Sequence, residues 1–414
     1  TMKTNIAILT ALISATSFAG TPEPLCFAFD GAAVMGAVAV GAGSVYSAET
    51  GFGWIAGSKT VFAVKVPEGR YDVDVLFASP EAAAAATVKA EARRLVLAPL
   101  TKPGSAVRQF TVAVLTPQIP TGGSIGLKGG EADSETWNDR LTIEFLPDAS
   151  KVAAIAIRPA SDVLTVFIAG DSTVTDQGGE PWGGWGQMLP RFFGPGVAVA
   201  NYAGSGRALF SFRGERRLKK MLETMKPGDY LFIQFGHNDQ KDKSEGAGPF
   251  TTYTTNLFEY VDAVRAKGGI PVILSPMERR RWKEGRPGET LTAYADAAHQ
   301  AAVAAKVPYI DLHGMSLALY GALGESGSAR AFVHYPPNTF PGQERKLADN
   351  THHNAFGAYE LARCVVEGIR TGVPGLAGRL RDDCAPFDPT HPDDPEAFPI
   401  PPSAKPDLET PAGN

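Results

Sequence analysis

The stretch VLTVFIAGDST, residues 163–173, carries an apolar run that ends abruptly in a glycine, a carboxylate and two hydroxyl groups. Further apolar runs follow it: GVAVANYAG, DYLFIQFGHND, IPVILSP and VPYIDLHG, at residues 196–204, 229–239, 270–276 and 307–314. Segments of helical periodicity separate these runs, as at residues 212–224, 256–267 and 294–305. Repeated strand–helix units predict a parallel sheet wrapped by helices, and we expect this α/β domain over residues 160–371.

A different pattern precedes this domain. The runs YDVDVLFA, RQFTVAVL and RLTIEFLP, at residues 71–78, 108–115 and 140–147, alternate between apolar and polar residues and lie between Gly and Pro punctuation. This pattern predicts an all-β sandwich over residues 25–147. The run DASKVAAIAIRPASD, residues 148–162, is interpreted as a connector into the first parallel strand. We expect the β region to assist polymer binding and to take no part in the chemistry.

The two ends of the chain have their own signatures. Met2 and Lys3 precede an apolar run at residues 6–13, and small residues follow at Ser17 and Ala19. This order predicts a signal peptide over residues 1–19, and hence a secreted or periplasmic protein. Residues 372–414 are rich in Pro and Asp, which predicts a tail that lies on the surface or is disordered.

Composition excludes several classes of function. The chain has 414 residues, 20% of them charged, and a formal net charge of -5. Without a long block of Lys or Arg, it offers no electrostatic footprint for nucleic acid, and no apolar run is long enough to insert across a membrane. The seven histidines include no His-Glu-x-x-His motif and the cysteines have no metal-ligand spacing, so we expect no metal and no other cofactor. We expect a monomer.

The three cysteines provide no disulfide framework. Cys364 and Cys384 flank the last helical segment and could form a bridge, which would leave Cys26 unpaired.

Polar residues gather where the predicted parallel strands end. Ser172 follows the first strand, NYAGSGR (residues 201–207) ends the second, and GHND (residues 236–239) ends the third. Because ligands bind beyond the carboxyl ends of parallel strands, these segments are expected to form one site. Asp349 and His352 stand three residues apart just ahead of a helix, where the carboxylate can hold the imidazole that activates a serine. The sequence therefore predicts a Ser-His-Asp hydrolase.

An oxyanion hole is predicted from the same strand ends. The backbone N–H groups of Ser172 and Gly206 and the side-chain amide of Asn238 lie on neighbouring loops, and a glycine allows the main chain to approach closely. By contrast, GGSIG at residues 122–126 matches the nucleophile-elbow pattern but has no helix after it, and we interpret that match as accidental.

These blocks resemble those of the SGNH, or GDSL, hydrolases, and several details resemble the rhamnogalacturonan acetylesterase family. The quoted blocks are GDSTV, WGQMLPRFF, NYAGSGRA, QFGHND, SPMERRRW and DNTHHNAFGA. The resemblance implies catalysis by Ser172, Asp349 and His352 without a metal. It also implies a flavodoxin-like three-layer α/β/α sandwich, preceded by a β-sandwich of the galactose-binding-like type. His353 stands where relatives usually carry an aromatic residue, so the base is assigned to His352 from the Asp-x-x-His spacing.

The expected activity is removal of acetyl groups from the pectic polysaccharide rhamnogalacturonan, as polymer or oligosaccharide. Aromatic faces could stack on sugars and arginines could bind galacturonate carboxylates. The candidate substrate-binding residues are Trp182, Trp185, His237, Arg280, Arg281 and Trp282. Two alternatives stay open: a non-catalytic carbohydrate-binding protein that uses Trp54 and Trp137, and an esterase acting on another acyl ester, such as acetylated xylan or a short-chain lipid.

Overall fold

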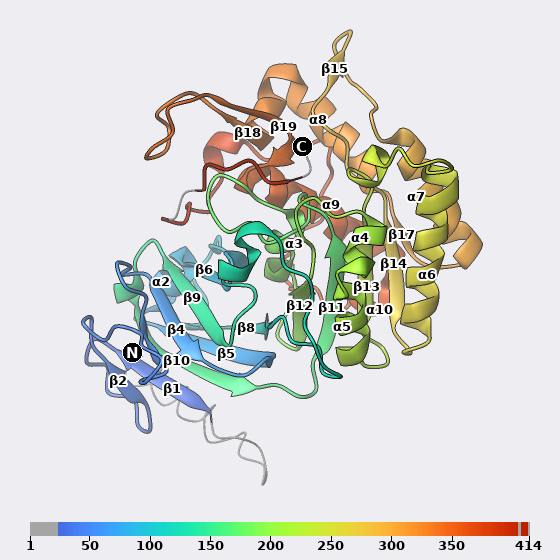
Figure 1. Ribbon diagram of the computed structural model, residues 1–414. Helices are drawn as coiled ribbons and strands as arrows, with labels where there is room; N and C mark the ends of the chain where they lie inside the picture. Colours follow the sequence, from blue (N-terminus) through green and yellow to red (C-terminus); the bar gives the residue numbers. More distant parts are fainter. Residues whose placement is uncertain (1–23, 405–406, 413–414) are drawn as a thin grey trace.

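The computed structural model describes residues 24–404 and 407–412, and shows a β-sandwich packed against a three-layer α/β domain (Figure 1). The predicted signal peptide, residues 1–19, lies outside the described residues. Within the described part of the chain, no helix is long and apolar enough to span a membrane.

The α/β domain is built on a parallel sheet with the strand order β12-β11-β13-β14-β17. Its strands are β11 (Leu164–Gly170), β12 (Val197–Asn201), β13 (Tyr230–Gln234), β14 (Ile270–Leu274) and β17 (Tyr309–Ile310). Side chains alternate between the faces of β11, so that Val166 and Ile168 enter one apolar core while Phe167 and Ala169 enter the other. The sheet is therefore covered on both faces.

Helices form the two outer layers (Figure 1). One face packs against α4 (Leu209–Gly214), α5 (Arg217–Thr224), α6 (Thr254–Arg265) and α7 (Thr292–Ala305). The other packs against α3 (Trp185–Met188), α8 (Leu312–Ser328), α9 (Ala355–Gly372) and α10 (Pro374–Ala377). Two small hairpins complete the domain: β15 (Trp282–Lys283) with β16 (Arg286–Pro287), and β18 (Phe332–Tyr335) with β19 (Leu347–His353). This arrangement confirms the predicted α/β/α fold.

The β-sandwich consists of two sheets with the orders β2-β1-β10-β5-β8 and β3-β4-β9-β6-β7. The first contains β1 (Leu25–Phe29), β2 (Val38–Val40), β5 (Gly69–Phe77), β8 (Val107–Val114) and β10 (Val152–Pro159). The second contains β3 (Phe52–Trp54), β4 (Val61–Lys65), β6 (Thr87–Ala90), β7 (Arg94–Leu97) and β9 (Arg140–Leu146). One apolar core lies between the sheets. The expected all-β region is thus present.

The segment interpreted as a connector is a central strand of the sandwich. β10 pairs antiparallel with both β1 and β5. Ile155 and Ile157 enter the core between the sheets, while Ala154 and Ala156 pack on the opposite face. The interpretation as a connector was wrong because a strand that is buried on both faces shows no polar–apolar alternation. The sandwich therefore extends to Pro159.

The two domains share apolar cores. Leu95 and Ala98 of the sandwich pack into the core that contains α3 and α9, and Leu115 packs into the core on the other face of the parallel sheet. Trp137 is 6% exposed and meets Tyr202 edge to face, with ring centroids 5.4 Å apart. The interface is therefore an extension of the α/β core.

The Pro- and Asp-rich tail follows the surface of both domains and is anchored at several points. Phe387 and Ile400 are buried against the α/β core. The backbone N–H of Ser403 donates to Glu180 Oε1 (3.0 Å), and its hydroxyl donates to Glu144 Oε2 of the sandwich (2.6 Å). The described part of the tail is therefore packed along the surface. All three cysteines are free in this structure, including Cys364 and Cys384.

The shared cores predict that the α/β domain depends on the sandwich for stability. A fragment of residues 161–414 exposes the apolar surfaces that Leu95, Leu115 and Trp137 cover, so its thermal unfolding temperature is expected to fall well below that of the whole chain. Circular dichroism melts of the two proteins at equal concentration provide the comparison. An equal melting temperature, with the fragment monodisperse, would show that the interface contributes nothing to stability.

Candidate active site

The predicted catalytic residues come from three separate elements that end at one edge of the parallel sheet. Ser172 lies two residues after the end of β11, and Asn238 lies four residues after the end of β13. Asp349 and His352 belong to β19, rather than to a turn entering a helix as the spacing suggested; α9 begins at Ala355. The main chain still bends locally, because Asp349 Oδ1 accepts hydrogen bonds from the N–H groups of Thr351 (2.7 Å) and His352 (2.8 Å).

Ser172, His352 and Asp349 form a continuous chain of hydrogen bonds. Ser172 Oγ lies 2.8 Å from His352 Nε2, and His352 Nδ1 lies 2.8 Å from Asp349 Oδ2. Burial acts to raise the pKa of Asp349. The hydrogen bonds and charge of His352, together with the Thr351 amide, outweigh this effect, so the pKa of Asp349 lies below its usual value. Asp349 is therefore an ionised acceptor that fixes the His352 ring with Nε2 toward the serine.

The predicted oxyanion-hole donors lie on the loops beside Ser172. Gly206 has φ +77°, a left-handed conformation that favours glycine. Among the residues that the structure describes, no acceptor is recorded for the backbone N–H of Ser172 or of Gly206. The Asn238 amide donates one hydrogen bond to Arg207 O (3.1 Å), which fixes its orientation and leaves a second N–H. This arrangement is what an oxyanion site requires, and its catalytic role stays a prediction.

The adjacent His353 points into the core and behaves as an aromatic ring. Its Nε2 lies 2.8 Å from the Tyr320 hydroxyl, and its ring packs on Phe332 with centroids 4.2 Å apart. Burial, with a smaller effect from neighbouring histidines, lowers the pKa of His353 to about 3, so the ring is neutral near neutral pH. The geometry therefore favours His352 as the base.

The tryptophans predicted to stack on sugars are buried. Trp185 is fully buried in the α/β core, where its Nε1 donates to Gln234 Oε1 (2.9 Å), so its assignment to substrate binding was wrong. Trp182 is 1% exposed and packs edge-on against His352, with centroids 5.8 Å apart. It supports the His352 ring and offers no free face in this structure. Trp54 is likewise a core residue of the sandwich. Trp137 packs in the shared core but also lines a pocket between the two domains, so the alternative that used both tryptophans for carbohydrate binding keeps only Trp137.

The other predicted binding residues are only partly brought to the site. His237 is fully buried, with Nδ1 3.5 Å from Asp171 Oδ2, so it cannot contact substrate in this structure; burial also lowers its pKa. Arg280 is held by Glu325 O (2.6 Å) and by Asn350 Oδ1 (3.2 Å), beside Asp349. Arg281 and Trp282 lead into the β15–β16 hairpin, which projects at the periphery of the molecule (Figure 1). Their role in binding stays a prediction.

Several residues at the site have no local motif that could have revealed them. Asp176 lies four residues after Ser172. Its Oδ2 is 2.5 Å from Arg94 Nε of the sandwich, and its Oδ1 accepts a hydrogen bond from Asn201 Nδ2 (2.8 Å). Gln177 Nε2 donates to Ser172 O (2.7 Å). The approach of Arg94 depends on how the domains pack, so no spacing in the sequence indicates it.

The C-terminal segment 407–412 crosses the site. Asp407 O accepts a hydrogen bond from Trp182 Nε1 (2.8 Å), on the side of His352. At the other end Ala412 packs against Gly206, where an added Cβ would lie 3.2 Å from the alanine methyl. Ser172 and His352 are each 1% exposed. The segment therefore packs against Trp182 and Gly206, on two sides of the predicted active site.

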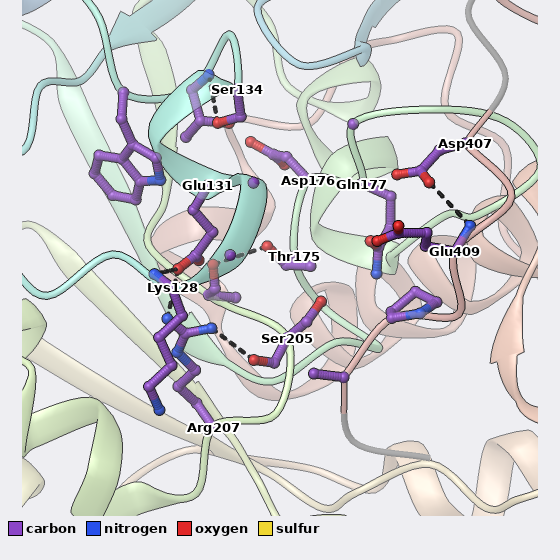
Figure 2. Close-up of a pocket in the computed structure, with 18 of the residues that line it drawn as sticks. Lys128, Glu131, Ser134, Thr175, Asp176, Gln177, Ser205, Arg207, Asp407 and Glu409 are labelled. Carbon is purple, nitrogen blue, oxygen red and sulfur yellow. Dashed lines mark hydrogen bonds and ion pairs between the residues drawn. The ribbon is translucent and has the colours of Figure 1, made fainter.

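A polar pocket of about 360 Å³ opens between the two domains and this segment (Figure 2). Residues of the sandwich, of the loops after β11 and β12, and of the C-terminal segment line it. Its charged and amide side chains are Lys128, Glu131, Asp176, Gln177, Arg207, Asp407 and Glu409.

Replacing His353 with phenylalanine is expected to change stability more than activity. The variant removes the hydrogen bond between His353 and the buried Tyr320 hydroxyl, at a cost of about 0.5–1.5 kcal/mol, but keeps the ring packing. His353 has a lowered pKa in the folded state, so between the unfolded pKa and about 3 the unfolded state binds more protons and stability falls as pH falls. Urea unfolding at pH 7 and pH 5 measures this effect. Between these two pH values the free energy of unfolding should fall less for His353→Phe than for wild type.

Activity measurements separate the two adjacent histidines. His352→Ala should abolish ester hydrolysis, whereas His353→Phe should keep kcat within a few-fold of wild type. A reversed order in kcat would assign the base to His353.

Removal of residues 405–414 is expected to raise kcat/KM for a small aryl acetate. With the segment in place, only the fraction of molecules in which it has moved away can bind substrate, and the apparent affinity falls by that fraction. Initial rates of the truncated and full-length chains, with melting curves to show that the fold is kept, provide the measurement. A lower kcat/KM at an unchanged melting temperature would mean that the segment forms part of the working site.

Several known proteins are similar to this chain. Residues 168–358 match the GDSL-like lipase/acylhydrolase family. The chain is 43% identical over 215 residues to the rhamnogalacturonan acetylesterase RhgT of Bacillus subtilis, a match that covers 51% of this chain and 92% of the relative. It is 34% identical over 213 residues to the probable rhamnogalacturonan acetylesterase YesY of the same organism, covering 50% and 94%.

A third relative extends over both domains. The uncharacterized esterase YxiM of Bacillus subtilis is 28% identical over 328 residues, which is 77% of this chain and 76% of that protein. The crystal structure of YxiM covers 86% of this chain and 99% of its own, with a TM-score of 0.47 and 24% identity. On the strength of the 43% identity across nearly all of one relative, the chain belongs to the GDSL-like lipase/acylhydrolase family and is a serine esterase.

Proposed function

We propose that this protein is a carbohydrate acetylesterase that removes acetyl groups from rhamnogalacturonan by a Ser-His-Asp mechanism. The observation that carries the proposal is the hydrogen-bonded chain Ser172–His352–Asp349, with both bonds at 2.8 Å, beside two backbone amides without recorded acceptors among the described residues. The substrate class is supported by the two relatives named rhamnogalacturonan acetylesterase, at 43% and 34% identity.

The geometry supports the following steps. His352 Nε2 takes the proton of Ser172 Oγ as the oxygen attacks the acetyl carbonyl carbon. The N–H groups of Ser172, Gly206 and Asn238 receive the negative charge that develops on the carbonyl oxygen. His352 then gives its proton to the departing sugar oxygen, which leaves an acetyl-serine. A water molecule, deprotonated by His352, attacks this ester, and His352 returns the proton to Ser172 Oγ as acetate leaves. Asp349 stabilises the imidazolium in both halves of the cycle.

The pocket between the domains favours a sugar over a lipid. Most of its lining side chains are charged, amide or hydroxyl groups, which can bind sugar hydroxyls and would exclude a long acyl chain. Acidic groups outnumber basic ones among these residues, and Arg207 is already paired with Glu131 and Glu215. We therefore expect the pocket to take an uncharged sugar unit, with galacturonate carboxylates held elsewhere.

The proposal includes secretion, since a pectic polymer is too large to enter a cell. It rests on the sequence of residues 1–19, which lie outside the described residues.

Acetate release from three substrates tests the proposal. Acetylated rhamnogalacturonan should give the highest kcat/KM, acetylated xylan a lower one, and a short-chain lipid ester the lowest. Ser172→Ala should lower the rate on every substrate by about 10⁴-fold or more, because the nucleophile is lost while the oxyanion site stays. Preference for xylan would contradict the substrate class. Activity of Ser172→Ala within tenfold of wild type would contradict the mechanism.

A further inference from the structure

A carboxylate of the β-sandwich reaches the loop that carries the oxyanion hole. Glu131 lies in the 3-10 helix η1 (Gly129–Asp133) and faces two arginines of the α/β domain. Its carboxylate accepts hydrogen bonds from Arg207 Nη2 (2.5 Å) and from Arg217 Nη2 (2.8 Å to each oxygen). Figure 2 shows Glu131 on η1 opposite the loop that carries Ser205 and Arg207.

The two arginines hold the main chain on both sides of Gly206. Arg217 Nη1 donates to Tyr202 O (3.0 Å), and Arg207 Nη1 donates to Ser205 O (2.6 Å). Glu215 Oε2 bridges Nε of both guanidinium groups, at 2.9 and 3.0 Å. The loop from residue 202 to residue 207 is therefore fixed by a cluster of two guanidinium and two carboxylate groups.

This cluster also sets the position of Asn238. Arg207 O accepts the hydrogen bond from Asn238 Nδ2 (3.1 Å). A displacement of Arg207 thus moves two of the three predicted oxyanion donors, the Gly206 N–H and the Asn238 amide. Because the donors must lie about 2.7–3.1 Å from the oxyanion, even a small displacement weakens the stabilisation.

Glu131 is hard to replace because the charges it meets are buried. The side chains of Arg207 and Arg217 are 2% and 0% exposed, and Glu131 supplies one of their two carboxylate partners. Removing one partner of a buried ion pair leaves charge uncompensated, and the remaining groups then rearrange. The groups free to rearrange are the ones that hold the Gly206 loop.

We propose that Glu131 is a positioning residue for the oxyanion hole, so that the β-sandwich takes part in the chemistry by fixing the geometry of the Gly206 loop. The inference rests on the proposed Ser-His-Asp mechanism. It replaces the expectation that the sandwich only assists polymer binding.

The test uses a small aryl acetate, which makes no remote contacts, so that kcat reports the reacting centre alone. Glu131→Ala should lower kcat by about 10- to 100-fold with KM unchanged within twofold, because the oxyanion donors act only as charge develops. Glu131→Gln keeps one acceptor oxygen but loses the other and the charge, so its kcat should fall between those of wild type and Glu131→Ala. The matched control is Glu135→Ala, since Glu135 pairs with Arg140 inside the sandwich (2.8 Å) and should leave kcat unchanged.

A double-mutant cycle separates positioning from general loss of structure. If Glu131 acts through the oxyanion hole, Glu131→Ala should lower kcat less in an Asn238→Ala background than in wild type, because only the Gly206 donor is left to displace, and the two effects should be non-additive. The pH profile of kcat/KM should keep the wild-type inflection, because the base is untouched. Full additivity, or equal losses in Glu131→Ala and Glu135→Ala, would overturn the inference.

Two further readouts keep the outcomes distinct. If Glu131→Ala does not fold, as judged by circular dichroism, Glu131→Gln carries the test, and wild-type kcat in that folded variant would overturn the inference. Ser172→Ala in the same assay reports on the proposed function itself. If Ser172→Ala loses activity while Glu131→Ala keeps wild-type kcat, the positioning role of Glu131 is rejected and the proposed function stands.

Discussion

The hydrogen bond between Ser172 Oγ and His352 Nε2 joins residues 180 positions apart in the chain. It can form only if the end of β11 and the last residues of β19 meet at one edge of the sheet. The parallel order β12-β11-β13 meets part of this constraint, because it brings every strand's carboxyl end to that edge. The Gly183 N–H, which donates to His353 O (2.9 Å), ties β19 to the loop after β11. The site is thus a product of topology, and Asp349 then fixes the orientation of the base.

Packing between the domains imposes a second constraint on the same edge. Arg94 pairs with Asp176 next to the loop that carries Ser172, and Glu131 pairs with Arg207 on the loop that carries Gly206. Both pairs are largely buried and are supported by apolar contacts such as Trp137 on Tyr202. Two loops of the catalytic domain are therefore held from outside it. A domain attached only to deliver polymer would need no such contacts with these loops.

The sequence predicted the α/β fold and the convergence of the catalytic residues because both follow from local patterns. Apolar strands that end in polar blocks indicate where a site lies, and the Asp-x-x-His spacing identified the paired side chains. β10 was missed because a central strand has no alternation, and its residues looked like a linker.

The binding residues were harder to predict. Tryptophan is used both in cores and on sugar-binding faces, and only the structure shows Trp185 inside the core and Trp182 against the base. Glu131 and Arg207 are 76 residues apart in different domains, and no spacing rule links them.

The identity of the nucleophile is the claim on which the account depends most. Incubation of the whole chain with an organophosphate, followed by peptide mass spectrometry, identifies the modified serine directly, because only an activated hydroxyl reacts quickly. A single adduct is expected on Ser172, and it should be lost in His352→Ala. An adduct on another serine, such as Ser124 in the GGSIG segment, or equal labelling in the absence of His352, would contradict it.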